Sequence, residues 1–71
     1  GKTVKAPMPG SILRFTVKPG DTVTKGQTVV ILEAMKMENS IATDYAGTVK
    51  RLLVKEGTTV AADAPMIEIE A

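Results

Sequence analysis

The chain contains an internal repeat, and this repeat restricts its fold more than any other feature. A shift of 37 residues aligns residues 6–33 with residues 43–70 and gives eight identities: Gly10/Gly47, Arg14/Arg51, Val17/Val54, Lys18/Lys55, Gly20/Gly57, Thr22/Thr59, Val23/Val60 and Glu33/Glu70. Unrelated segments of that length share about two at average residue usage. Because two copies are too few for a solenoid, we predict two similar halves, about 4–34 and 37–71, that close on each other across a pseudo-twofold axis.

Each half is typical of short β-strands separated by turns. Val, Ile and Thr are frequent, Gly and Pro recur every few residues, and no stretch carries an uninterrupted helical period with caps. Pro19-Gly20 fits the central positions of a type II turn, and the matching Glu56-Gly57 keeps the glycine that supplies a positive φ. We therefore predict an all-β fold, a flattened barrel or sandwich of two four-stranded antiparallel sheets.

The repeat also predicts which side chains point into the core. Successive strand residues face opposite sides of a sheet, so the face that is apolar in both halves is the better core face. This criterion selects Val30, Leu32, Ile67 and Ile69, and it places Val29, Ile31, Met66 and Glu68 on the other face. Further inward-facing pairs are Val4/Ile41, Leu13/Lys50, Phe15/Leu52, Val17/Val54 and Val23/Val60. We expect Lys50, the polar member of this set, near a strand end.

Composition excludes several functional classes. The chain lacks cysteine and histidine, so it has no thiol or imidazole catalyst and cannot form the usual zinc sites. Basic and acidic residues are balanced at nine and eight, and Phe15 and Tyr45 are the only aromatic residues. We therefore expect no nucleic-acid partner, and no membrane insertion because no apolar run could span a bilayer. We predict one domain, residues 1–71, and its start at Gly1 indicates a fragment or C-terminal part of a longer chain.

The two halves meet at a predicted hairpin. The strand-like stretches 28–34 and 37–43 leave only Met35 and Lys36 between them, which is the length of a two-residue turn. A type I′ turn of that length requires positive φ at both central residues and favours Asn and Gly. Met35 and Lys36 are therefore unfavourable turn residues. Local stability does not account for their presence.

A lysine at such a tip is accessible to another enzyme on nearly all sides. Lysine amines are protonated at neutral pH, so a partner would have to remove the proton and present an activated carboxyl group. Met35 and Met37 would form an apolar collar beside Lys36. Glu33 and Glu38 would face each other across the strands, which is mildly destabilising for like charges. The simpler interpretation is an ordinary exposed turn lysine with two surface methionines beside it.

Residues 34–37, AMKM, with Glu33 before them and APMPG at residues 6–10, resemble the biotinyl domain of biotin-dependent carboxylases, decarboxylases and transcarboxylases. The resemblance covers essentially the whole chain. It implies a flattened barrel of the single hybrid motif type with its modified lysine on an exposed hairpin. It also implies that a biotin–protein ligase joins biotin to Lys36 through an amide.

The resemblance further implies a carrier without catalytic residues or a metal. The biotin on Lys36 would be carboxylated at a biotin carboxylase site and would carry the carboxyl group to or from a carboxyltransferase site. The remaining candidate residues are motif flanks or recognition residues: Ala34, Met35, Met37, Glu33 and Glu38. The expected location is the cytoplasm, with the inner membrane face for a sodium-pumping decarboxylase and the mitochondrial matrix for a eukaryotic carboxylase.

The sequence is compatible with more than one kind of carrier. Carriers of the bacterial acetyl-CoA carboxylase type have an inserted thumb, whereas residues 11–23 run through without an insertion. This favours the compact carriers of pyruvate or propionyl-CoA carboxylase, transcarboxylase or a decarboxylase. Lipoyl domains share the fold but usually have aspartate where Met35 stands. Two classes outside the carriers also stay open: a barrel-sandwich adaptor with unmodified Lys36, and an enzyme that uses Glu33 and Glu38 as a carboxylate pair, although without a pocket.

Overall fold

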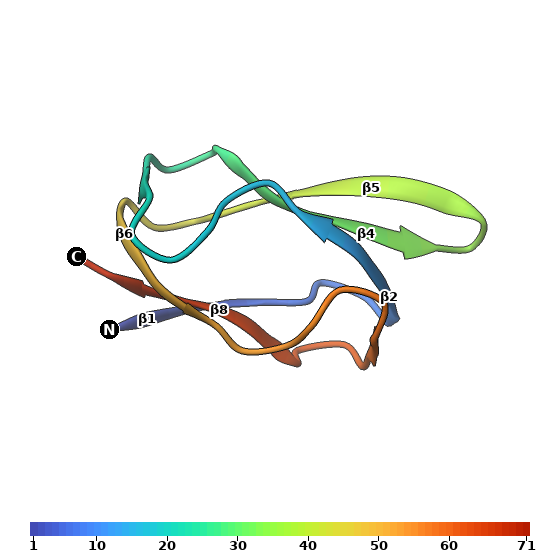
Figure 1. Cartoon of the computed structure of the whole chain (residues 1–71). Helices are drawn as coiled ribbons and strands as arrows, with labels where there is room; N and C mark the ends of the chain where they lie inside the picture. The colour runs from blue at the N-terminus through green and yellow to red at the C-terminus, as the bar shows by residue number, and fades with distance from the viewer.

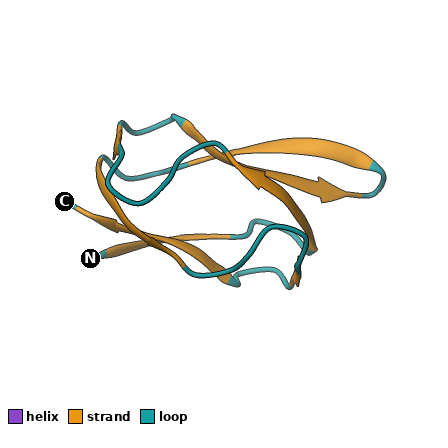
Figure 2. Cartoon of the chain, viewed as in Figure 1, coloured by secondary structure: helices purple, strands orange, loops and turns teal.

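The computed structural model describes residues 1–71 and contains strands and no helix. The strands are β1 (Lys2–Lys5), β2 (Gly10–Phe15), β3 (Thr22–Val23), β4 (Thr28–Ala34), β5 (Met37–Ala42), β6 (Gly47–Leu52), β7 (Thr59–Val60) and β8 (Pro65–Glu70). They form two four-stranded antiparallel sheets, ordered β1-β8-β6-β3 and β5-β4-β2-β7, that enclose a flattened barrel (Figure 1, Figure 2). The predicted all-β fold is confirmed. No helix that could cross a membrane is present.

The strand order shows the predicted pseudo-twofold symmetry. The shift of 37 residues superposes β1, β2, β3 and β4 on β5, β6, β7 and β8, and it converts the order of the first sheet into the order of the second. Each sheet therefore takes two strands from each half. Within the first half only β2 and β4 pair with each other, so the sheets form only when the halves combine.

The turns predicted around Gly20 and Gly57 are present at equivalent places. Gly20 has a φ of 97° and Gly57 a φ of 86°. In each turn an N–H donates to the carbonyl three residues earlier, at 3.1 Å for Asp21 and 3.2 Å for Thr58. The repeat thus preserves the glycine because it preserves a backbone conformation that other residues adopt at a cost.

The core is a single cluster of 14 buried apolar side chains. It includes nine of the predicted inward-facing residues: Val4, Val17, Val23, Val30, Leu32, Ile41, Val60, Ile67 and Ile69. Three further predicted residues, Phe15, Leu52 and Val54, are half-buried and pack against this cluster. The selection of the core face from the repeat is therefore confirmed for these positions.

The prediction is wrong for Leu13 and Lys50, because a β-bulge lies at each of them. The pairing of β2 with β4 and of β6 with β8 shifts by one residue at these two positions, and such an extra residue interrupts the alternation of side chains. Ile12 and Val49 are buried in their place. Lys50 lies inside β6 rather than near its end, and its Nζ is 3.2 Å from a carboxylate oxygen of Glu70.

A second pair of bulges shows that the prediction for the outer face is also wrong at two positions. Val29 in β4 and Met66 in β8 are unpaired residues at register shifts, and both are fully buried although alternation predicted them on the outer face. The bulge directs Val29 inward beside Val30, and Met66 inward beside Ile67. Ile31 is also buried, but it does not join the core cluster.

Candidate functional site

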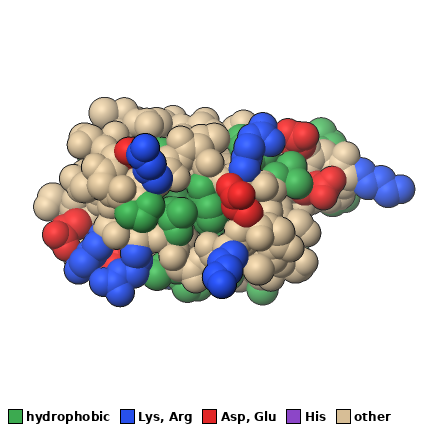
Figure 3. Space-filling view, viewed as in Figure 1, with side chains coloured by type: hydrophobic (Ala, Val, Ile, Leu, Met, Phe, Trp, Pro, Cys, Tyr) green, Lys and Arg blue, Asp and Glu red, His purple; other side chains and the backbone are tan.

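The β4–β5 hairpin has the predicted register. Glu33 pairs with Glu38 and Ala34 with Met37, which leaves two turn residues at the tip. Figure 1 shows the hairpin projecting from the end of the barrel opposite the two chain termini. In the space-filling view a basic side chain extends from this end, with acidic side chains behind it (Figure 3). The tip is therefore the part of the molecule farthest from both termini.

The turn residues adopt a strained conformation. Met35 has a φ of 54° and Lys36 a φ of 64°, and Asp63 is the only other non-glycine residue with positive φ. These are the left-handed values that a type I′ turn requires. For residues with a Cβ this conformation costs about 1 kcal/mol or more each. The prediction that Met and Lys are unfavourable in this turn is thus supported by the backbone geometry.

The side chains at the tip are directed into solvent. Met35 is 93% exposed and Met37 65% exposed, and Lys36 is also exposed. Lys36 takes no part in the three ion pairs or in any side-chain hydrogen bond of the structure. Ala34, the preceding motif residue, is buried at the base of the turn. The tip therefore presents one free amine between two free thioethers on a backbone anchored by Ala34.

Asn39 supports the hairpin in a way that sequence analysis missed. Its Nδ2 donates to the carbonyl oxygen of Met37 at 3.2 Å and to that of Leu32 at 3.4 Å. The bond to Leu32 connects β5 to β4 close to the tip, and the bond to Met37 lies within β5. An Asn that follows the motif and can bond to nearby backbone carbonyls was the available signal.

Arg14 is a second residue near the site that sequence analysis missed. Its Nη2 lies 3.8 Å from Oε1 of Glu38, with both side chains more than half exposed. The guanidinium offsets part of the repulsion between Glu38 and Glu33, although an exposed pair at this distance contributes little to stability. The predicted opposition of the two glutamates is confirmed, but Arg14 adds a positive charge to the pair.

The repeat explains why Arg14 is available to Glu38. Its equivalent, Arg51, lies opposite Glu68 and contacts it at 2.9 Å. The residue opposite Arg14 is Ile31, so no carboxylate is present at the matching position. Because Ile31 stands where the other half has Glu68, Arg14 has no carboxylate opposite it and can contact Glu38 in the hairpin that carries Lys36.

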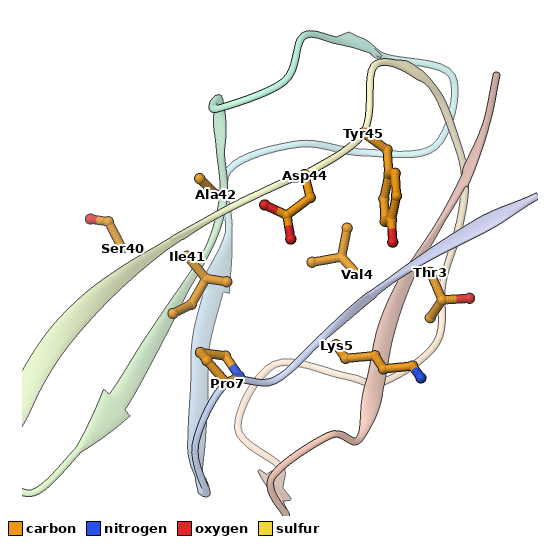
Figure 4. Close-up of a pocket in the computed structure, with 9 residues that line it drawn as sticks. All are labelled: Thr3, Val4, Lys5, Pro7, Ser40, Ile41, Ala42, Asp44 and Tyr45. Carbon is orange, nitrogen blue, oxygen red and sulfur yellow. The ribbon is translucent and has the colours of Figure 1, made fainter.

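The larger of two surface cavities lies away from the tip. It has a volume of about 460 Å³, lies between β1 and β5, and includes Val4 and Ile41 among its lining residues (Figure 4). Asp44 and Tyr45 line one side, and Lys2 Nζ lies 5.7 Å from the centroid of the Tyr45 ring. Asp44 is the only carboxylate of the lining, so this cavity holds no carboxylate pair.

Glu33 and Glu38, the carboxylate pair that an enzyme would use, line neither cavity of the protein. The two glutamates lie on the open surface of the hairpin, beside the exposed amine of Lys36.

We predict that relaxing the turn stabilises the fold. The double change Met35→Asn and Lys36→Gly places residues at the tip that accept positive φ, so the free energy of unfolding should rise by about 1 kcal/mol and the melting temperature by about 4–8 °C. Thermal unfolding followed by circular dichroism measures the change. The control Met35→Val should lower the melting temperature, because β-branched residues tolerate this conformation poorly. An unchanged melting temperature in the double variant would contradict the strained turn.

We also predict that Met35→Leu and Met37→Leu each change the free energy of unfolding by less than about 0.5 kcal/mol, because both side chains are exposed. Met66→Ala is the matched control. Met66 is fully buried, and its truncation should cost about 2–5 kcal/mol. Urea titration compares the three variants, and a large loss in either leucine variant would mean that the tip packs against other residues.

The fold and the tip together define a class of protein: a small β-barrel that carries one exposed lysine at the tip of a projecting hairpin. The chain matches the family described as "Biotin-requiring enzyme" over residues 2–69, and it belongs to this family. The predicted resemblance to biotinyl domains of biotin-dependent carboxylases is confirmed, and biotin is the cofactor that the family implies.

Individual relatives agree with this assignment. The chain is 52% identical over 67 residues to the biotin carboxyl carrier protein of Streptococcus mutans, covering 94% of this chain and 52% of that protein. It is 42% identical over 67 residues to the mitochondrial propionyl-CoA carboxylase alpha chain of Homo sapiens, covering 94% of this chain and 9% of that protein. The urea carboxylase of Kluyveromyces lactis superposes with a TM-score of 0.91 at 29% identity, covering 97% of this chain and 6% of that protein.

The chain thus spans about half the length of the first relative and about a tenth of the second. These relatives do not favour a lipoyl carrier or an unmodified adaptor, the two competing assignments within this fold.

Proposed function

We propose that the chain is a biotin carboxyl carrier domain and that Lys36 is the residue to which biotin is attached. The observation that carries the proposal is the position of Lys36, which is alone and unpaired on a strained turn at the end of the barrel. A turn whose backbone is strained and that places a lysine at its tip is typical of a functional site. The free amine and the open space around it fit a covalently attached cofactor.

The chain holds Lys36 in an accessible position, and the partner enzyme supplies the chemistry that attaches biotin. Amide formation requires the Lys36 amine to lose a proton, and the structure gives its side chain no hydrogen-bond partner that could accept it. The ligase would therefore provide the base and the activated carboxyl group. The two-residue turn lets the tip enter a narrow site, while Ala34 and Asn39 hold the strands behind it.

Bound biotin supplies a ureido group that takes up and releases a carboxyl group. The chain contributes reach: the molecule measures 32 × 19 × 18 Å, and Lys36 lies at the opposite end from both termini (Figure 1). Any segment joined to either terminus would leave the tip free to move between two active sites. We propose that the domain performs no reaction by itself.

The partners follow from the same proposal. They are a biotin–protein ligase and the biotin carboxylase and carboxyltransferase parts of a parent enzyme. The connection from β2 to β3 covers only residues 16–21, so the first half has no room for an inserted thumb. This supports a carrier of the pyruvate or propionyl-CoA carboxylase, transcarboxylase or decarboxylase type.

The test is intact mass before and after incubation with biotin, ATP and a biotin–protein ligase, followed by peptide mapping. We expect one biotin per chain, located on Lys36. The chain has six other lysines, and exposed ones such as Lys25 serve as internal controls. Label distributed over several lysines, or no label on the folded chain, would contradict the proposal.

A further inference from the structure

The four methionines of the chain divide sharply by exposure. Met35 and Met37 are 93% and 65% exposed, whereas Met66 is fully buried and Met8 is half-buried against the core. Two other large hydrophobic side chains are exposed, neither by more than 40%. The most exposed apolar surface of the protein therefore consists of two thioethers, and both are adjacent to Lys36.

We propose that Met35 and Met37 form a reversible redox site that controls the acylation of Lys36, an inference that rests on the proposed function of that lysine. The co-reactant is a peroxide such as hydrogen peroxide. The thioether sulfur donates an electron pair to a peroxide oxygen, so an S–O bond forms as the O–O bond breaks. The sulfur is oxidised to the sulfoxide and the peroxide is reduced to water, as the departing hydroxide takes the proton of the transferred hydroxyl.

The turn geometry makes this oxidation selective and compatible with the fold. The left-handed backbone at Met35 keeps its side chain on the outside of the hairpin, where the sulfur is open to a small oxidant. A polar sulfoxide at Met35 or Met37 stays in water and disturbs no packing. Met66 can be oxidised only if the core opens, so its reactivity measures unfolding.

Oxidation of Met35 and Met37 is expected to weaken the binding of the ligase to the tip. A ligase that encloses Lys36 also covers the two side chains next to it, which as thioethers can be buried favourably. Conversion to sulfoxides makes both side chains polar and removes this hydrophobic contribution. We expect ligation of Lys36 to slow by about tenfold, the loss expected from one apolar contact of methionine size. Sulfoxide reductases reverse the change by restoring the thioether.

The first experiment locates the oxidation. Trypsin places the four methionines on four separate peptides, because it cleaves after Lys5, Arg14, Lys25, Lys36 and Lys50 among other sites. The chain is treated with increasing concentrations of hydrogen peroxide, and mass spectrometry measures the addition of one oxygen atom to each peptide. We expect oxidation of Met35 first and Met37 next, with Met8 slower and Met66 unreacted below the melting temperature. Equal reactivity at all four positions would overturn the inference.

The second experiment measures biotin incorporation by a biotin–protein ligase on reduced and oxidised chains. The double variant Met35→Leu and Met37→Leu keeps an apolar collar without an oxidisable sulfur, so its rate of biotin incorporation, compared with its own rate before treatment, should not change after peroxide. Met8→Leu is the matched control and should stay sensitive. Treatment of the oxidised wild-type chain with a methionine sulfoxide reductase should restore the rate.

The outcomes separate this inference from the proposed function. An unoxidised chain that takes no biotin overturns both. A chain that takes biotin equally fast before and after oxidation of Met35 and Met37 overturns the redox site alone. The same conclusion follows if peroxide slows the double leucine variant as strongly as the wild type, because the oxidised group would then lie elsewhere.

Discussion

Replacing Lys36 with arginine should abolish biotin incorporation and leave the fold intact. Arginine keeps the positive charge and the length of the side chain, and the exposed tip places no packing demand on it, so the free energy of unfolding should change by less than about 0.5 kcal/mol. The guanidinium is not deprotonated in proteins and cannot act as the nucleophile. Incorporation should fall to the background measured without ligase, whereas circular dichroism and the melting temperature should match the wild type.

Lys25→Arg is the matched control for this variant. Lys25 is also an exposed turn lysine, but it lies in the body of the barrel between β3 and β4. Its replacement should leave incorporation unchanged. Labelling of the Lys36→Arg chain at Lys2, Lys5 or any other lysine would refute the assignment of the site, because it would show that exposure alone decides where the ligase acts.

The position of the tip could be predicted from sequence because two independent constraints coincide there. The repeat fixes where one half ends and the other begins, and strand-like residues on both sides leave room for only Met35 and Lys36. Register then follows from the turn length. The same repeat predicts a symmetric pair of sheets, although it does not by itself show that each sheet mixes strands from both halves.

The bulges could not be predicted from alternation, because a bulge is a property of two paired strands. The sequence nevertheless held a signal at Leu13, Lys50 and Val29. Leu13 matches Lys50, and a position that is apolar in one half and charged in the other is a poor core candidate. Val29 begins a run of four apolar residues through Leu32, which indicates that both faces of β4 are covered.

Contacts made by single polar side chains near the tip were also beyond prediction. Whether Arg14 reaches Glu38 depends on the distance across β4, and whether Asn39 bonds to Met37 depends on its rotamer. Neither quantity is encoded in a periodic pattern. The residue type at Asn39 indicates bonding to a nearby backbone carbonyl, but it does not identify the partner. The repeat could at most show that Arg14 and Arg51 have different neighbours, since Glu68 corresponds to Ile31.

A large loss of stability is expected from Gly10→Ala. A Cβ at this position would overlap the backbone carbonyl of Glu33 in β4, and Gly47 makes the same approach to Glu70 in the other half. Gly10 matches Gly47 and Glu33 matches Glu70 in the repeat, so the same close contact between two strands occurs once in each half. A backbone carbonyl cannot move aside without separating β2 from β4, three residues before Lys36. We expect a loss of about 3 kcal/mol or more, at the upper end for overpacking.

Gly57→Ala distinguishes this steric cause from the general cost of replacing glycine. Gly57 has a φ of 86°, but a Cβ there would meet nothing within 4 Å, so only the backbone penalty of about 1 kcal/mol applies. Gly10→Ala should therefore lower the melting temperature by more than about 10 °C, and Gly57→Ala by about 4–8 °C. If both variants lower the melting temperature by the same amount, the close contact between Gly10 and Glu33 does not exclude a side chain at position 10. If Gly10→Ala alone also slows biotin incorporation at a temperature where it is folded, that contact sets the position of the tip as well.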